Sequence, residues 1–106
     1  MKESAFQHKL IKTIEDRFPG AIVMKNDPNY IQGIPDLTVL YENNWATLEC
    51  KKSEKENHQP NPDYYVEKMN GMSYSAFVYP ENMEETLDAM ERSFKTRRAT
   101  RSSKSK

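Results

Sequence analysis

The most informative segment of the chain spans residues 36 to 51 and reads DLTVLYENNWATLECK. Its two halves are rich in β-branched and aromatic residues, which are typical of strands. Between them lies Asn43-Asn44, and asparagine tolerates the positive φ angles of a tight turn. The segment therefore predicts a β-hairpin with strands at 36–42 and 45–51 and a two-residue loop at Asn43-Asn44.

The register of this hairpin sorts its side chains into two faces, because successive residues of a strand point to opposite sides of a sheet. With the loop at Asn43-Asn44, Thr38 pairs with Glu49 and Asp36 pairs with Lys51. One face is then apolar or carries a thiol: Leu37, Val39, Tyr41, Ala46, Leu48 and Cys50. The other face carries Asp36, Thr38, Leu40, Trp45, Thr47, Glu49 and Lys51. An odd loop would place the two carboxylates on opposite faces, so the two-residue loop is our prediction.

Two carboxylates and one ammonium gather on the polar face. In the predicted register Asp36 and Glu49 are diagonal neighbours, with backbone positions roughly 5 to 8 Å apart. Mg²⁺ or Mn²⁺ binds between such carboxylates, and Lys51 on the same face can orient a water or offset charge on a phosphate. These residues indicate metal-dependent hydrolysis of a phosphodiester. The alternative is a cross-strand salt bridge on a solvated face.

The flanking sequence predicts the remaining elements. Phe6, Leu10, Ile14 and Phe18 form the apolar stripe of a helix that ends at Pro19-Gly20. A short strand at 21–25, a loop at 26–35 and a polar loop at 52–60 surround the hairpin. A helix follows from Asn61 as N-cap to Gly71 as C′ residue, then a strand at 73–79 and a helix that starts at Asn82. The order α-β-β-β-α-β-α predicts an α/β fold, a mixed sheet with helices against it.

Length and composition limit the classes of protein. The 106 residues suit one domain, and one cysteine excludes an internal disulfide. Cys50 belongs to the apolar face, which favours a buried thiol over a nucleophile. The sequence shows neither a signal peptide nor an apolar run of about 20 residues, so we expect a protein of the cytoplasm, the host cytoplasm if it is phage-encoded.

The formal charge of zero conceals an uneven distribution. Residues 95–106 hold six basic side chains and no acidic one, whereas residues 1–94 hold ten basic and sixteen acidic side chains. Such asymmetry indicates a polyanion as a partner. We therefore predict a domain at 1–94 followed by a basic, disordered tail at 95–106.

Pro35-Asp36, the hairpin, and Glu49-Cys50-Lys51 together resemble the signature of the PD-(D/E)xK nuclease superfamily. The predicted order of elements also matches its restriction-endonuclease-like αβββαβ core, here with an extra C-terminal helix. Within the superfamily, the chain is most similar to small phage-type and archaeal-type Holliday junction resolvases and to VRR-NUC domains.

The resemblance implies roles for individual residues. Asp36, Glu49 and Lys51 would be catalytic, and Glu3 near the start of the first helix would be a further metal ligand. The backbone carbonyl of Cys50 would complete the ligand set. Gln59 matches a glutamine that follows the lysine in VRR-NUC domains, although Pro60-Asn61-Pro62 departs from their continuous helical start.

The function implied is a Mg²⁺- or Mn²⁺-dependent DNA endonuclease that acts on branched or junction DNA as a homodimer. Trp45, Tyr30 and Ile31 are candidates for exposed apolar contacts between subunits. Two alternatives stay open on the sequence. One is a non-catalytic nucleic-acid-binding or assembly module, and the other is a nuclease that acts on linear duplex ends, flaps or RNA.

Overall fold

The computed structural model describes residues 3–53 and 60–104, with side-chain surroundings for 3–53 and 63–96. The elements in chain order are α1 (Glu3–Arg17), β1 (Ile22–Lys25), β2 (Leu37–Tyr41), β3 (Asn44–Cys50), α2 (Pro60–Met72), β4 (Tyr74–Val78), the short 3₁₀ helix η1 (Pro80–Asn82) and α3 (Met83–Lys104). Apart from η1, this is the predicted order.

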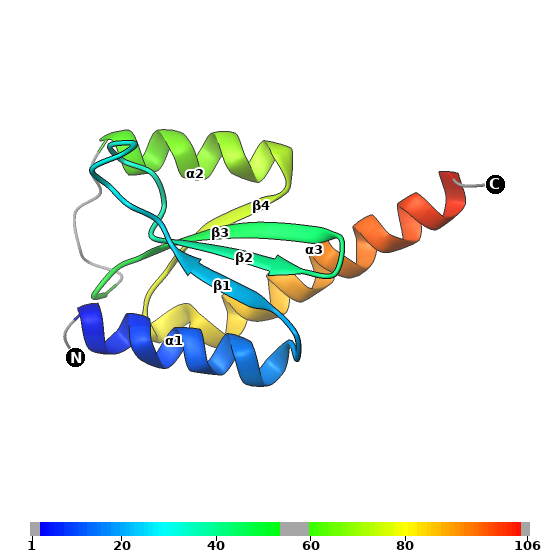
Figure 1. Ribbon diagram of the computed structural model, residues 1–106, viewed down its shortest axis with the longest axis horizontal. Helices are drawn as coiled ribbons and strands as arrows, with labels where there is room; N and C mark the ends of the chain where they lie inside the picture. Colours follow the sequence, from blue (N-terminus) through cyan, green and yellow to red (C-terminus); the bar gives the residue numbers. More distant parts are fainter. Residues whose placement is uncertain (1–2, 54–59, 105–106) are drawn as a thin grey trace.

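The four strands form one mixed sheet in the order β1-β2-β3-β4. β2 is antiparallel to both β1 and β3, and β4 runs parallel to β3. In Figure 1, α2 lies on one side of the sheet, and α1 and α3 lie on the other. The predicted α/β class with a mixed sheet between helices is confirmed.

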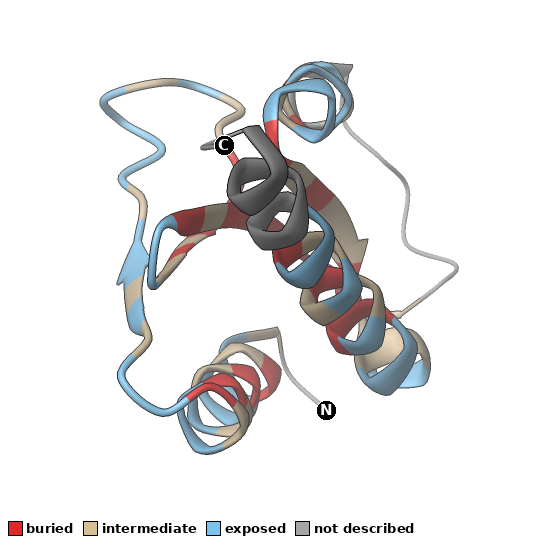
Figure 2. Ribbon diagram, turned by 90° about the vertical axis from the view of Figure 1, so that its right-hand side faces the viewer, coloured by how far each residue is buried: buried red, intermediate tan, exposed pale blue. Residues whose placement is uncertain are grey.

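The hydrophobic core lies between the sheet and the helices α1 and α3. Its sheet residues are Leu37, Val39, Ala46, Leu48, Cys50 and Val78. Its helical residues are Phe6, Leu10, Ile14, Phe18, Leu87, Met90 and Phe94. In Figure 2 the buried stripes of α1 and α3 face the sheet. The apolar face predicted for the hairpin is therefore the core face, and the polar face is the one toward α2.

The turn of the hairpin lies one residue earlier than predicted. Tyr41 pairs with Asn44 and Thr38 pairs with Thr47, so the two-residue loop is Glu42-Asn43. Glu42 supplies the positive φ angle, 57°, that we had assigned to asparagine. Both registers leave two residues in the loop and so give the same two faces. The predicted pairing of Asp36 with Lys51 is wrong, because the observed register sets Asp36 opposite Glu49.

Two helix boundaries also differ from the prediction. α2 begins at Pro60 and includes Asn61, which we had expected to be its N-cap. Gly71 is inside the helix rather than at C′, since the Ser73 N–H still donates to the Met69 carbonyl at 2.8 Å. Asn82 ends η1 rather than capping α3, and its side chain bonds backbone groups of Tyr79 and Phe77 next to it.

The predicted disordered tail is helical as far as the structure describes it. α3 continues from the core residue Phe94 to Lys104. No proline or glycine occurs between residues 95 and 104 to end it, and Lys95 pairs with Glu91 one turn earlier at 3.0 Å. Within the described ranges, no helix has the length and apolar character needed to cross a membrane.

Candidate functional site

Asp36 and Glu49 meet at the end of the β2–β3 ladder. The Asp36 N–H donates to Glu49 Oε1 at 3.2 Å, and the Cys50 N–H donates to Asp36 Oδ2 at 2.8 Å. Each carboxylate is thus held by a backbone N–H of the opposite strand. Glu49 is 8% exposed and Asp36 is half-buried, so the glutamate is the better shielded of the two acids.

Lys51 brings an ammonium group to the same place. Its Nζ lies 3.8 Å from Glu49 Oε2, and the residue is only 5% exposed. The Lys51 N–H donates to the Val78 carbonyl at 2.9 Å, and the ammonium lies 5.7 Å from the centre of the Phe77 ring. The strand β4 therefore holds Lys51 beside the carboxylates, as the hairpin pattern predicted for a shared face.

The surroundings of Asp36 and Glu49 disfavour the state in which both carboxyl groups are ionised. Burial, with smaller contributions from the Asp36 and Glu3 carboxylates, raises the pKa of Glu49 to about 8. Lys51 and the Asp36 N–H act in the opposite direction but do not cancel it. Lys51 offsets only part of the repulsion between the Asp36 and Glu49 carboxylates, and a cation placed between them would offset the rest.

The first turn of α1 adds Glu3 to this environment. The Glu3 charge raises the pKa of both Glu49 and Cys50, which places its carboxylate within electrostatic reach of the hairpin end. One turn later, Gln7 forms a hydrogen bond with the Cys50 thiol. We had not singled out Gln7 from the sequence. Its spacing of four residues from Glu3 is the signal that could have found it.

Asn26 is a second residue that sequence reasoning missed. Its N–H donates to the Asp36 carbonyl at 2.8 Å, and its Nδ2 donates to the Pro35 carbonyl at 2.9 Å. Extending the β1–β2 register by one pair sets Asn26 opposite Asp36. No motif marks this residue, because its role depends on where the loop at 26–35 closes.

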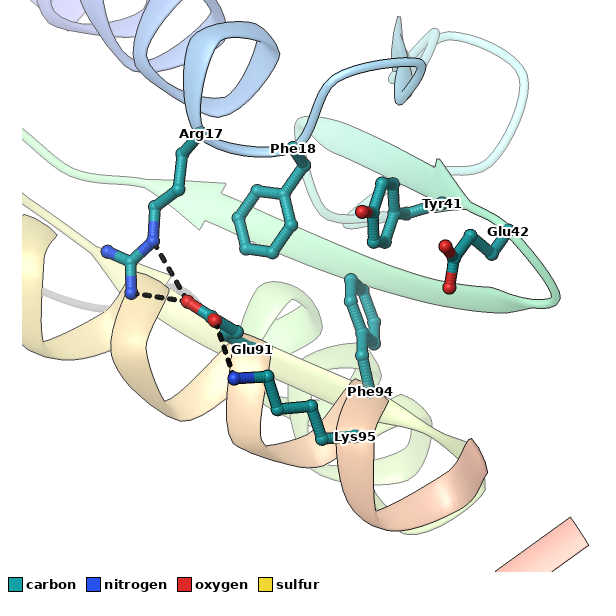
Figure 3. Close-up of a pocket in the computed structure, with 7 residues that line it drawn as sticks. All are labelled: Arg17, Phe18, Tyr41, Glu42, Glu91, Phe94 and Lys95. Atoms are coloured by element: carbon teal, nitrogen blue, oxygen red, sulfur yellow. Dashed lines mark hydrogen bonds and ion pairs between the residues drawn. The ribbon is translucent and has the colours of Figure 1, made fainter. Parts of the chain in front are cut away.

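Other candidates lie elsewhere or outside the described residues. Gln59 is not among the described residues, so its predicted role stays a prediction. Within 3–53 and 60–104, no three His, Cys, Asp or Glu side chains gather closely enough to hold a metal ion. A hollow of about 200 Å³ at another place, shown in Figure 3, is lined by Arg17, Phe18, Tyr41, Glu42, Glu91, Phe94 and Lys95.

That hollow is formed where α1, the hairpin tip and α3 meet. Arg17 bonds Glu91 at 2.8 Å, and Glu91 also bonds Lys95, as Figure 3 shows. The rings of Phe18 and Phe94 below them are almost fully buried. These charges join the two helices to each other and include none of the predicted site residues.

Comparisons with known proteins support the fold. No model of a known protein family matches the sequence, and no curated protein matches it. A solved structure described as a VRR_NUC domain superposes with a TM-score of 0.59 at 22% identity, over 76% of this chain and 92% of that one. At this identity the likeness concerns the fold: the chain has an α/β fold consistent with a VRR_NUC, restriction-endonuclease-like core.

Proposed function

We propose that this protein is a metal-dependent endonuclease that hydrolyses phosphodiester bonds in DNA. The observation that carries the proposal is the facing pair of Asp36 and Glu49 with the buried Lys51 beside it. The same fold in a VRR_NUC domain supports it. In this reading the polar end of the hairpin is an active site rather than a structural ion pair.

The donor set fits a hard divalent cation. Asp36 and Glu49 offer carboxylate oxygens from adjacent strands, which is the ligand type that Mg²⁺ and Mn²⁺ take in phosphoryl chemistry. Within the described residues no three such side chains gather closely, so Glu3 would add a third carboxylate only if the first turn of α1 moved toward the hairpin. The Cys50 carbonyl would add a neutral oxygen. When bound, the cation would polarise the phosphoryl group and make water a stronger nucleophile. The raised pKa of Glu49 reflects the burial and the neighbouring negative charge that such a cation would compensate.

Lys51 would act on the attacking water and on the phosphate. Its ammonium is fixed between β3 and β4, so it needs little reorganisation when negative charge develops on the phosphoryl oxygens. In-line attack by water would break the bond to the 3′ oxygen and leave a 5′-phosphate and a 3′-hydroxyl, as in the family that the sequence resembles.

DNA is the substrate class that the charge distribution favours. Residues 1–94 carry a net charge of −6, which suits a cation site but opposes approach of a polyanion. Residues 95–106 carry six basic side chains, and α3 extends most of this segment as a helix. In Figure 1 that end of α3 projects beyond the sheet, where it would contribute sequence-independent affinity for phosphates.

Branched DNA and a homodimer complete the proposal. A four-way junction presents two symmetric strands, so two copies related by a two-fold axis would bring one site to each. Tyr30 is 85% exposed, whereas Trp45 and Ile31 are half-buried. Among the three residues that we predicted for subunit contacts, Tyr30 therefore offers the most surface.

The test is a cleavage assay with Mg²⁺ or Mn²⁺ on a junction, a flap, linear duplex, single strand and RNA. Asp36→Asn and Glu49→Gln should abolish cleavage and leave DNA binding in place. Asp16→Asn, an exposed acid of α1, is the matched control and should cut like the wild type. Equal cleavage by Asp36→Asn and Asp16→Asn would refute the assignment. Binding of DNA without cleavage under every condition would instead favour the non-catalytic binding module.

A further inference from the structure

We propose that Asn26 and Thr38 are positioning residues that fix Asp36 for the cation site. The inference rests on the proposed function. It starts from the place where the ten-residue loop at 26–35 begins and ends. β1 stops at Lys25, yet the ladder continues for one more pair, because the Asn26 N–H donates to the Asp36 carbonyl. Asn26, Asp36 and Glu49 consequently form one row across the first three strands.

The Asn26 side chain holds the same segment from a second direction. Its Nδ2 donates to the Pro35 carbonyl at 2.9 Å and lies 2.9 Å from the Thr38 hydroxyl. That hydroxyl in turn donates to Asn26 Oδ1 at 3.0 Å. The carbonyls of Pro35 and Asp36 therefore both accept hydrogen bonds from one asparagine, and Thr38 sets the plane of its amide.

These hydrogen bonds fix the position of the Asp36 carboxylate, which is a proposed metal ligand. The peptide between Pro35 and Asp36 is held on its carbonyl side by Asn26 and on its N–H side by Glu49. Rotation of this peptide would move the Asp36 carboxylate away from the Cys50 N–H. A displacement of about 1 Å at a reacting group can cost on the order of 10²-fold in rate. Partners that orient metal ligands typically contribute roughly 10- to 100-fold in affinity or activity.

Thr38→Val is the sharpest test, because valine keeps the shape and the strand propensity while removing the hydroxyl. We expect kcat to fall about 10-fold, KM for DNA to stay within about twofold, and Mn²⁺ affinity to fall about 10-fold by paramagnetic resonance. Thr38→Ser, which restores the hydroxyl, should recover most of both losses. Asn26→Ala should lower kcat and Mn²⁺ affinity further than Thr38→Val, because it also frees the Pro35 carbonyl.

Two matched controls separate positioning from general damage. Asn29→Ala lies in the same loop at an exposed position, and Thr13→Val removes a hydroxyl that bonds the Lys9 carbonyl on the surface of α1. Both should behave like the wild type. Hydrogen exchange of the Cys50 amide can be measured by nuclear magnetic resonance. It should be faster in Thr38→Val and Asn26→Ala only, because in these variants the Asp36 carboxylate holds the Cys50 N–H less firmly.

The positioning role would be overturned if Thr38→Val and Asn26→Ala matched the control Asn29→Ala in kcat, in Mn²⁺ affinity and in the exchange rate of the Cys50 amide. It would also be overturned if the fall in kcat were fully explained by a smaller fraction of folded protein in the variants. Failure of the proposed function gives a different result, since the wild type would then cut no nucleic acid. In that case Mn²⁺ affinity and Cys50 exchange in Thr38→Val still decide whether the two residues position Asp36.

Discussion

Asp36 and Glu49 hold one another through the backbone of the opposite strand: the N–H of Asp36 bonds the Glu49 carboxylate, and the N–H beside Glu49 bonds the Asp36 carboxylate. The reciprocity keeps two acids adjacent in a largely buried place. It also links the geometry of the site to the register of the hairpin, because a shift of the ladder would break both bonds at once.

Glu49 should make the metal-free protein less stable as pH rises. Its ordinary pKa of 4.5 is raised to about 8 in the folded chain, so between these values the folded state keeps a proton that the unfolded chain has released. The free energy of unfolding should therefore fall across this window, by at most about 1.4 kcal/mol per pH unit from this group. Urea unfolding with a chelator present, from pH 5 to 9, measures it.

The control for this pH effect is Glu49→Gln, which cannot ionise. Subtracting its stability from that of the wild type at each pH isolates the contribution of Glu49 from all other titrating groups. A difference that stays constant with pH would contradict the prediction.

Cys50 should be an inert thiol in the native protein. Burial, together with the neighbouring charges of Asp36, Glu49 and Glu3, raises its pKa to about 12, and the residue is 1% exposed. Because the thiolate is the reactive form, reaction with an aromatic disulfide reagent at pH 7.5 should be many times slower in buffer than in urea. Similar rates in the two solutions would show that the thiol is accessible.

Gly71→Ala should stabilise the protein. Gly71 is in the helix α2, exposed and without a positive φ angle, and a Cβ built there meets no atom within 4 Å. Alanine in a helix is favoured over glycine by about 0.5 to 1 kcal/mol. Thermal unfolding of Gly20→Ala is the comparison, since Gly20 has φ of 92° and should lose stability on the same substitution. A lower midpoint for Gly71→Ala than for the wild type would contradict this prediction.

Replacing Arg97, Arg98 and Arg101 with glutamine should weaken DNA binding without stopping cleavage at low salt. For each phosphate that the variant no longer neutralises, the slope of log affinity against log salt should become shallower by about 0.9. Fluorescence anisotropy between about 50 and 300 mM salt measures the slope. The matched control replaces Lys9 and Lys12, exposed on α1, with glutamine. An unchanged slope in the triple variant would mean that the protein binds phosphates elsewhere on its surface.

Much of the fold followed from local patterns. The stripe of Phe6, Leu10, Ile14 and Phe18 was enough for α1, and all four are buried. The alternation from Leu37 to Cys50 was enough for the hairpin and for its core face. Such patterns can be recognised in a sequence because residues of a buried face recur every two positions in a strand and every three to four positions in a helix.

The register in which the strands pair was harder to predict from the sequence. Loops at Asn43-Asn44 and at Glu42-Asn43 both put Asp36, Glu49 and Lys51 on one face, so the pattern of faces could not choose between them. The observed register makes the two carboxylates direct rather than diagonal neighbours. Gly71 was misassigned for a related reason: glycine permits a helix to end, but hydrogen bonds farther along α2 decide whether it does.

The sequence by itself determined which residue types share the polar face, because alternation along a strand is a local property of the chain. Only the tertiary structure decided how that face becomes a site. The burial of Glu49, the seating of Lys51 against β4 and the closure of the loop by Asn26 all join segments far apart in the sequence. Their geometry depends on how the strands and the loop pack together, and no local pattern in the sequence specifies that packing.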